Sequence, residues 1–277
     1  MTHEDKVAHW IGTGKTGTEI GAGKVPIPGL VPTPIYVDCF TEFGGASCLA
    51  EYYGHAAALP FHANSLDYVA SSHVLEHVAN PLAALAEWYR VLRPDGIVYL
   101  VVPDRRHTWD HTRQLTTVEH MVDDFVHGTT PCDATHIDEF VYDMDWSRFS
   151  PTTEPAERPE RQAQLASGMR AAVERGEGIN IHFHTFEPHT IVQLFDALAQ
   201  RPHQRIRWEI LEQVERFPKS DPNGILTVAR AKKGWRDRAE ADWFRLRTPG
   251  DPRAAVREDA EPFAEYARKC SGLGGVR

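Results

Sequence analysis

The sequence predicts an α/β fold built on a mostly parallel, doubly wound sheet. Two short strand-like runs come first, and a long apolar strand is then followed by a helix pattern and a second apolar strand. The alternation of strand and helix returns near residue 180, as expected for such a sheet. Ligands of these folds bind beyond the carboxyl ends of the strands, so function is expected at residues 19–24, 38–40, 71–77 and 103–113.

The first strands are separated by an irregular loop. "TGTEIG" and "PIYVDCF" are strand-like, and "KVPIPGLVPTP" between them contains four prolines, which exclude a helix. Residues 66–72, "LDYVASS", form a third strand that is apolar enough to be buried on both faces.

A helix follows, with Asn80 as its N-cap and Pro81 at its first position, and "IVYLVV" is the next strand. Two further helices are expected near 116–127 and 159–175, the first with a capping box of Thr116 and Glu119. After "INIHFHTF" come a helix at about 188–200 and a closing antiparallel pair, "RIRWEILEQVERF" and "GILTVARA".

These elements suggest three parts. Residues 1–103 and 180–233 form the core, residues 104–179 form an insert or lid over an acceptor site, and residues 234–277 form a polar extension.

Composition narrows the functional classes. The 277 residues carry a formal net charge of -9, which disfavours a nucleic-acid partner, because phosphate backbones require a positive surface. The four cysteines form no C-x-x-C pair, and neither a signal-peptide core nor a membrane span is present. We expect a cytoplasmic protein without a membrane partner.

Glycines and a carboxylate follow the first two strands. Gly21 and Gly23 let a backbone approach a ligand closely, and Asp38 ends the second strand, where it can accept hydrogen bonds from ribose hydroxyls. A nicotinamide cofactor would require a third glycine and a helix that receives the pyrophosphate. Here that glycine is missing and prolines exclude the helix.

The motifs "EIGAG", "VD" at 37–38, "AALPFHANSLDYV", "SSHVLEHV" and "WYRVLRPDGIVYLVVPD" occur in this order. Together they resemble class I S-adenosylmethionine-dependent methyltransferases of the type 11 group, over roughly residues 17–104. The resemblance implies a Rossmann-like, seven-stranded sheet with helices on both faces, an antiparallel last strand and a helical insert after strand five. It also implies S-adenosyl-L-methionine as cofactor.

The resemblance assigns donor-binding roles to a set of residues at the strand ends. They are Glu19, Gly21, Ala22, Gly23, Asp38, His55, Ala56, Ser72 and His73. Two features depart from the family pattern: His55 stands where an Asp usually contacts the adenine, and the proline-rich loop replaces a helix.

The stretch "SSHVLEHV" also suggests a metal site. If it is helical, His73, Glu76 and His77 project from one face, a spacing suited to a divalent ion. It is similar to the E-x-x-E-H motif of methyltransferases that act on ubiquinone precursors and small-RNA ends, with His73 in place of the first glutamate. In metal-free family members the same residues serve packing, so this reading stays open.

In "INIHFHTF", strand alternation would send His182 and His184 to one face, where they would complete the metal site. A histidine-rich shell favours zinc, iron, cobalt, nickel or manganese over magnesium. Without a metal, the candidate catalytic residues are His77, His182, His184 and Asp104, the histidines because they titrate near neutrality.

The segment after strand five is where acceptors would bind. Arg105, Arg106 and Arg113 are suited to clamping a carboxylate or phosphate, and Trp109 to stacking on a ring. A solvated, salt-bridged loop is the alternative.

We therefore expect a methyltransferase that acts on a small polar molecule, at a hydroxyl, with or without a divalent metal. The alternatives are N-, C- or S-methylation without metal, and a non-catalytic protein that only binds the donor. The expected partner is a small-molecule substrate, and a homodimer is left open.

Overall fold

The computed structural model describes residues 1–43, 45–200, 206–247 and 251–272. A seven-stranded sheet runs through its centre in the order β5-β2-β1-β6-β7-β9-β8. The strands are β1 Gly17–Ile20, β2 Ile35–Asp38, β5 Tyr52–Tyr53, β6 Leu66–Ser72, β7 Leu92–Pro103, β8 Trp208–Phe217 and β9 Gly224–Ala231. A small separate hairpin pairs β3 Glu42–Phe43 with β4 Ala46–Ser47.

The sheet is parallel from β5 to β7, and β9 runs antiparallel between β7 and β8. The predicted closing antiparallel pair and the predicted doubly wound, mostly parallel sheet are thus confirmed. The strand order reverses at β1, which has β2 on one side and β6 on the other. This is where a ligand crevice is expected in an open α/β sheet.

Alternate side chains of the central strands enter two different cores. Val98 and Leu100 of β7 pack with the helices α2 Pro81–Val91, α3 Val118–His127 and α7 Pro188–Ala199. Tyr99 and Val101 face the other side, against α1 His3–Trp10 and the proline-rich segment. Since both faces of β7 are buried from Ile97 to Val102, its sequence is continuously apolar there.

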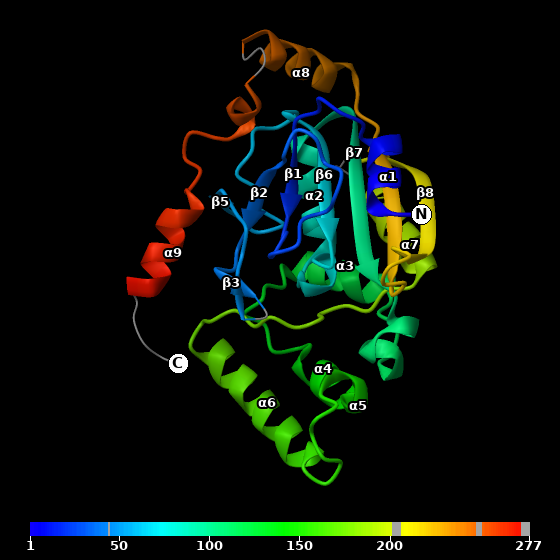
Figure 1. Ribbon diagram of the computed structural model, residues 1–277, viewed down its shortest axis with the longest axis vertical. Coiled ribbons are helices and arrows are strands. Elements are labelled where there is room, and N and C mark those ends of the chain that lie inside the picture. Colours follow the sequence, from blue (N-terminus) through cyan, green and yellow to red (C-terminus); the bar gives the residue numbers. More distant parts are fainter. Residues whose placement is uncertain (44, 201–205, 248–250, 273–277) are drawn as a thin grey trace.

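The insert lies beyond the end of the sheet at which β6 and β7 stop (Figure 1). Its helices are α4 Ile137–Asp143, α5 Trp146–Phe149 and α6 Arg158–Glu174, and they share an apolar cluster with the chain near residue 181. The insert therefore covers the edge of the sheet where function was predicted.

The C-terminal part holds α8 Trp235–Arg247 and α9 Phe263–Gly272. Backbone bridges join Tyr52 to Pro262 and Phe61 to Val256, so residues 256–262 and α9 run along the β5 edge of the sheet, whereas α8 contacts β7. The division into core, insert and extension stays a prediction. Among the described residues, no helix is both long and apolar enough to cross a bilayer.

Candidate functional site

A cavity of about 710 Å³ opens at the carboxyl ends of β1, β2 and β6. Its size is that of a small-molecule site. Among the predicted donor residues, the cavity is lined by Gly21, Gly23, Asp38, His55, Ala56 and His73. Glu19, Ala22 and Ser72 are not among the lining residues, although they neighbour them in the chain.

The glycine turn after β1 leaves room for a ligand. Gly21 and Gly23 have φ angles of 65° and 54°, which favour glycine. A Cβ on Gly21 would meet Val74 Cγ2 at 2.5 Å, whereas a Cβ on Gly23 would meet no atom within 4 Å. The chain thus packs tightly at Gly21 and is open at Gly23, toward the cavity.

Two carboxyl groups flank this turn. Asp38 Oδ1 accepts from the amide of Phe40 at 2.9 Å, and burial raises the pKa of Asp38. Glu19 Oε1 accepts from the amide of Ile27 at 2.8 Å, and burial raises the pKa of Glu19 to about 7. Asp38 therefore lines the cavity, whereas Glu19 holds the proline-rich loop against the sheet.

The predicted adenine side of the cavity includes Tyr266, which the sequence did not indicate as a site residue. The Nε2 atom of His55 lies 2.7 Å from the hydroxyl of Tyr53. Tyr266, from the far end of the chain, stacks on Tyr53 with ring centroids 4.0 Å apart and donates to the carbonyl of Cys39 at 3.1 Å. Tyr266 also lines the cavity.

The stretch after β6 does not form the α-helix that the metal-site spacing required. His73 has a φ of 55°, and only residues Leu75–His77 form a short 3-10 helix. The reason is that His73 extends the pairing of the sheet, since its amide donates to the carbonyl of Val101 at 2.9 Å, before the chain turns sharply. The i, i+4 geometry assumed for His73 and His77 is therefore wrong.

Glu76, His77 and His182 nevertheless converge, with one candidate ligand atom of each within 4.8 Å of the others. Glu76 is only 1% exposed, and neither of its carboxylate oxygens has a hydrogen-bond partner among the described residues. Burial raises the pKa of Glu76 to about 8 and lowers that of His77 to about 3. A buried carboxylate without donors is costly, and a cation held between it and the two imidazoles would satisfy it.

His182 is oriented by Asp110, whose Oδ2 lies 2.6 Å from its Nδ1 atom. Asp110 Oδ1 accepts from Arg113 at 2.8 Å. Burial opposes ionisation of Asp110, but its contacts with His182 and Arg113 outweigh this and lower its pKa. A carboxylate that fixes the far nitrogen of a histidine is the usual second partner of a metal ligand or a general base. The sequence alone assigned no role to Asp110, although Asp110 lies within the segment predicted to bind acceptors.

The structure does not bring the five predicted metal ligands together. His73 Nδ1 lies 3.7 Å from Glu76 Oε1 and so borders the group. His184 is fully buried and instead clusters with His120 and His136. Strand alternation failed here because residues 180–185 belong to no strand, so the pleat does not set the directions of His182 and His184.

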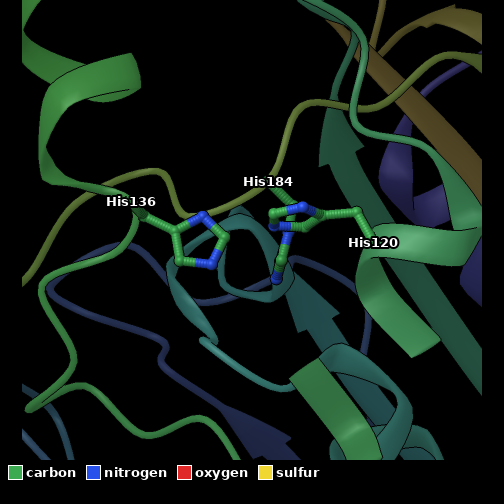
Figure 2. A group of neighbouring side chains, drawn as sticks. All are labelled: His120, His136 and His184. Atoms are coloured by element: carbon green, nitrogen blue, oxygen red, sulfur yellow. The ribbon is translucent and has the colours of Figure 1, made fainter. Parts of the chain in front are cut away.

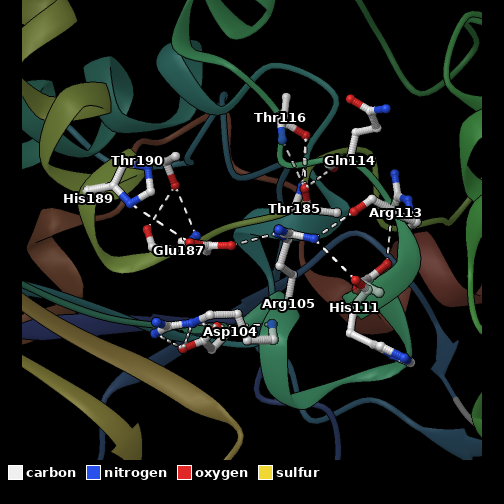
Figure 3. A network of polar contacts seen from close by, with 12 residues as sticks. Asp104, Arg105, His111, Arg113, Gln114, Thr116, Thr185, Glu187, His189 and Thr190 are labelled. Carbon is white, nitrogen blue, oxygen red and sulfur yellow. Dashed lines mark hydrogen bonds and ion pairs between the residues drawn. The ribbon is translucent and has the colours of Figure 1, made fainter.

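The segment after β7 is tied together internally (Figure 3). Asp104 is fully buried and pairs with Arg106, which also reaches Glu215. Arg105 donates to Glu187 at 2.8 Å and to backbone carbonyls of the same segment. An acceptor carboxylate would therefore have to displace partners that these arginines already have.

Arg113 is 2% exposed and also donates to the carbonyl of His182 at 2.9 Å. Trp109 lies against His182, with ring centroids 4.2 Å apart. Both residues thus surround His182 and hold it in place. Neither is among the residues that line the cavity.

Comparison with known proteins finds a methyltransferase domain in this chain. Residues 42–100 match a family described as methyltransferase domain. No match among curated proteins was found.

Solved structures give low-similarity matches. A methyltransferase from Methanosarcina mazei is 16% identical, with 84% of this chain and 100% of that chain covered and a TM-score of 0.42. The N1-methyltransferase of 1,6-didemethyltoxoflavin from Burkholderia thailandensis is 13% identical, with 83% and 77% covered and a TM-score of 0.43.

The CurJ carbon methyltransferase is 14% identical with a TM-score of 0.40; 80% of this chain is covered, and the chain spans about half (49%) of the CurJ chain. All three TM-scores are below 0.5, so the fold assignment rests on the strand order. Residues 42–100 thus match a methyltransferase domain, and the sheet around them has the Rossmann-like topology of S-adenosylmethionine-dependent methyltransferases.

Proposed function

We propose that this methyltransferase acts on a hydroxyl group of a small polar biosynthetic intermediate, with a divalent metal bound by Glu76, His77 and His182. The observation that carries the proposal is the buried Glu76 carboxylate, which has no hydrogen-bond partner and faces two imidazoles beside the cavity. S-Adenosylmethionine supplies an electrophilic methyl group, and the metal supplies positive charge that eases loss of the acceptor's proton.

The donor is held, in this proposal, by the residues at the strand ends. Asp38 accepts from the ribose hydroxyls, and the open backbone at Gly23 admits the donor closely. His55 and Ala56 flank the adenine, and His73 lies between the donor and the metal ligands. Glu19 acts indirectly, because it holds the proline-rich loop through the amide of Ile27.

The size of the cavity favours a small acceptor, because about 710 Å³ must hold the donor and the acceptor together. Its wall beyond the donor residues includes Thr129 and Thr130 of the insert, together with Asn80 and Asn180 of the core. His77 lines the cavity as well, so a metal on Glu76, His77 and His182 would lie at its wall.

A second candidate function is methyl transfer without a metal. It is favoured by the 2.6 Å contact of Asp110 with His182, which is the arrangement of an oriented general base. In that case the acceptor atom could be oxygen, nitrogen or sulfur.

Removal of bound metal by a chelator distinguishes metal-assisted from metal-free methyl transfer. Purified protein would be tested for metal content, then treated with a chelator and supplied with Co²⁺. Turnover would be followed as S-adenosylhomocysteine formed from a panel of small hydroxylated acceptors. We expect chelation to abolish turnover and Co²⁺ to restore it, and His182→Asn to lose the metal of this group and turnover while still binding S-adenosylhomocysteine.

His189→Asn is the matched control, because His189 is exposed and lies outside the cavity. Undiminished turnover after complete chelation would exclude the metal and leave the Asp110–His182 base. Normal donor binding without product from any acceptor would instead point to a non-catalytic donor-binding protein.

A further inference from the structure

A second group of histidines lies on the opposite side of residues 180–185 from His182. His120 comes from α3, His136 from the N-terminus of α4 and His184 from the segment after His182. One ring nitrogen of each lies within 4.8 Å of the others. Figure 2 shows the three rings, from three separate segments, gathered around one point.

Asp124 joins this group from α3, one turn after His120. Its Oδ2 atom lies 3.4 Å from His120 Nε2 and 3.7 Å from His184 Nε2, and its Oδ1 atom lies 3.4 Å from His136 Nε2. These distances are long for strong hydrogen bonds. Oδ2 is buried and has no hydrogen-bond partner. The carboxylate is therefore surrounded by imidazoles but poorly satisfied by them.

Outer contacts orient two of the rings. His136 Nδ1 lies 2.8 Å from Glu139 Oε1 and its Nε2 atom lies 3.4 Å from Asp124 Oδ1, so the ring is held between two carboxylates with Nε2 toward the group. His184 Nε2 lies 3.3 Å from the carbonyl of Ala79, which can only accept. His184 Nδ1 is thus left with a lone pair, and it is buried with no partner. Such outer partners are what metal-binding histidines typically have.

We propose that His120, His136 and His184 bind a zinc-type divalent cation, with the Asp124 carboxylate beside it, and that this ion fastens the insert to the core. Three imidazoles are a donor set for zinc or a similar transition metal, and not for magnesium. Zinc–nitrogen distances of about 2.1 Å would draw the ring nitrogens together by an ångström or so. His120 can make this movement and admit the ion, because its side chain is 45% exposed while His136 and His184 are buried.

The proposed ion would stabilise one wall of the cavity. Asn80 caps α2 and donates from Nδ2 to the backbone carbonyl of Asp124 at 3.2 Å. Thr129 donates to Asp124 Oδ1 at 2.9 Å. Asn80, Thr129 and Ala79, which contacts His184, all line the cavity. The ion would thus fix the loop after α3 against the N-terminus of α2, next to the donor site.

This site shares no ligand with the group of Glu76, His77 and His182, so it stands independently of the proposed function. The test is Co²⁺ and Zn²⁺ uptake by chelator-treated protein, measured by metal analysis and by the visible absorption of bound Co²⁺. Wild type is compared with His120→Asn, His182→Asn and the control His127→Asn. His127 is exposed on the same helix as His120 and contacts only the carbonyl of Asp123 among the described partners.

We expect His120→Asn to bind one equivalent fewer than wild type and His127→Asn to bind as much as wild type. Zinc should also slow hydrogen exchange in residues 129–136 of wild type and of His182→Asn, but not of His120→Asn. If only this second site exists, His120→Asn loses all bound metal and His182→Asn loses none. The proposal is overturned if His120→Asn, folded by circular dichroism, takes up as much metal as wild type, or if wild type takes up none.

Discussion

The Nδ1 atom of His182 lies 2.6 Å from the Oδ2 atom of Asp110. Because Asp110 occupies Nδ1, the Nε2 atom of His182 is the nitrogen left to face Glu76 and His77. Asp110→Asn would reverse the preferred tautomer, since an amide can donate to Nδ1. We expect metal affinity at this group to fall roughly 10- to 100-fold, measured by Co²⁺ titration. Asp123→Asn, on the exposed face of α3, should leave the titration unchanged.

The carboxylate of Asp38 should contribute directly to donor affinity. We expect Asp38→Ala to weaken S-adenosylhomocysteine binding by roughly ten- to a hundredfold, the effect of about 1.5–3 kcal/mol for lost hydrogen bonds to a charged group. Calorimetric titration measures this, with Asp259→Ala as the control because Asp259 pairs only with Arg257 on the surface. Equal affinities of the two variants would remove Asp38 from the donor site.

Gly21 and Gly23 should respond differently to alanine. Alanine at either position costs about 1–2 kcal/mol, because the backbone there is left-handed. Only Gly21→Ala also adds a clash, at 2.5 Å from Val74. We expect Gly21→Ala to lower the free energy of unfolding by a further 1–3 kcal/mol or so. Urea denaturation measures the free energy of unfolding of the two variants. Equal destabilisation would show that Val74 can move aside.

The buried Glu19 should make stability depend on pH. Its pKa is about 7 when folded and 4.5 when unfolded, so the folded state holds more protons between these values. The stability that it contributes is complete below about pH 4.5 and is lost as the pH rises through 7, by at most about 3 kcal/mol. Glu19→Gln cannot titrate. The fall in unfolding free energy from about pH 5 to about pH 7.5 should therefore be smaller in Glu19→Gln than in wild type; parallel curves would contradict this.

The sequence predicted the framework of the fold because the framework depends on local patterns. β6 occupies the predicted residues 66–72, and α2 begins at Pro81 with Asn80 as its N-cap, as apolar runs and capping chemistry indicate. The predicted capping box of Thr116 and Glu119 does not form. Thr117 is the N-cap of α3, because Thr116 is engaged in reciprocal hydrogen bonds with Thr185, 69 residues away.

The side-chain directions in the site could not be predicted in the same way. Whether residues 75–77 form an α-helix or a 3-10 turn depends on the pairing of His73 with Val101 of the neighbouring strand. His182 and His184 diverge because Asp110 and Ala79, each distant in sequence, attract them separately. Such contacts belong to tertiary packing, which overrides local periodicity.

The stacking of Tyr266 on Tyr53 has a consequence for the order in which the molecule is completed. The sheet that carries the donor-binding loops is finished once β9 has been made, but the side of the cavity near His55 lacks a wall until residue 266 has been added. A ribosome-bound chain that stops before this point would therefore fold its sheet and still hold S-adenosylmethionine weakly. Acquisition of the cofactor would then follow synthesis of residue 266, and would not guide the folding of the sheet.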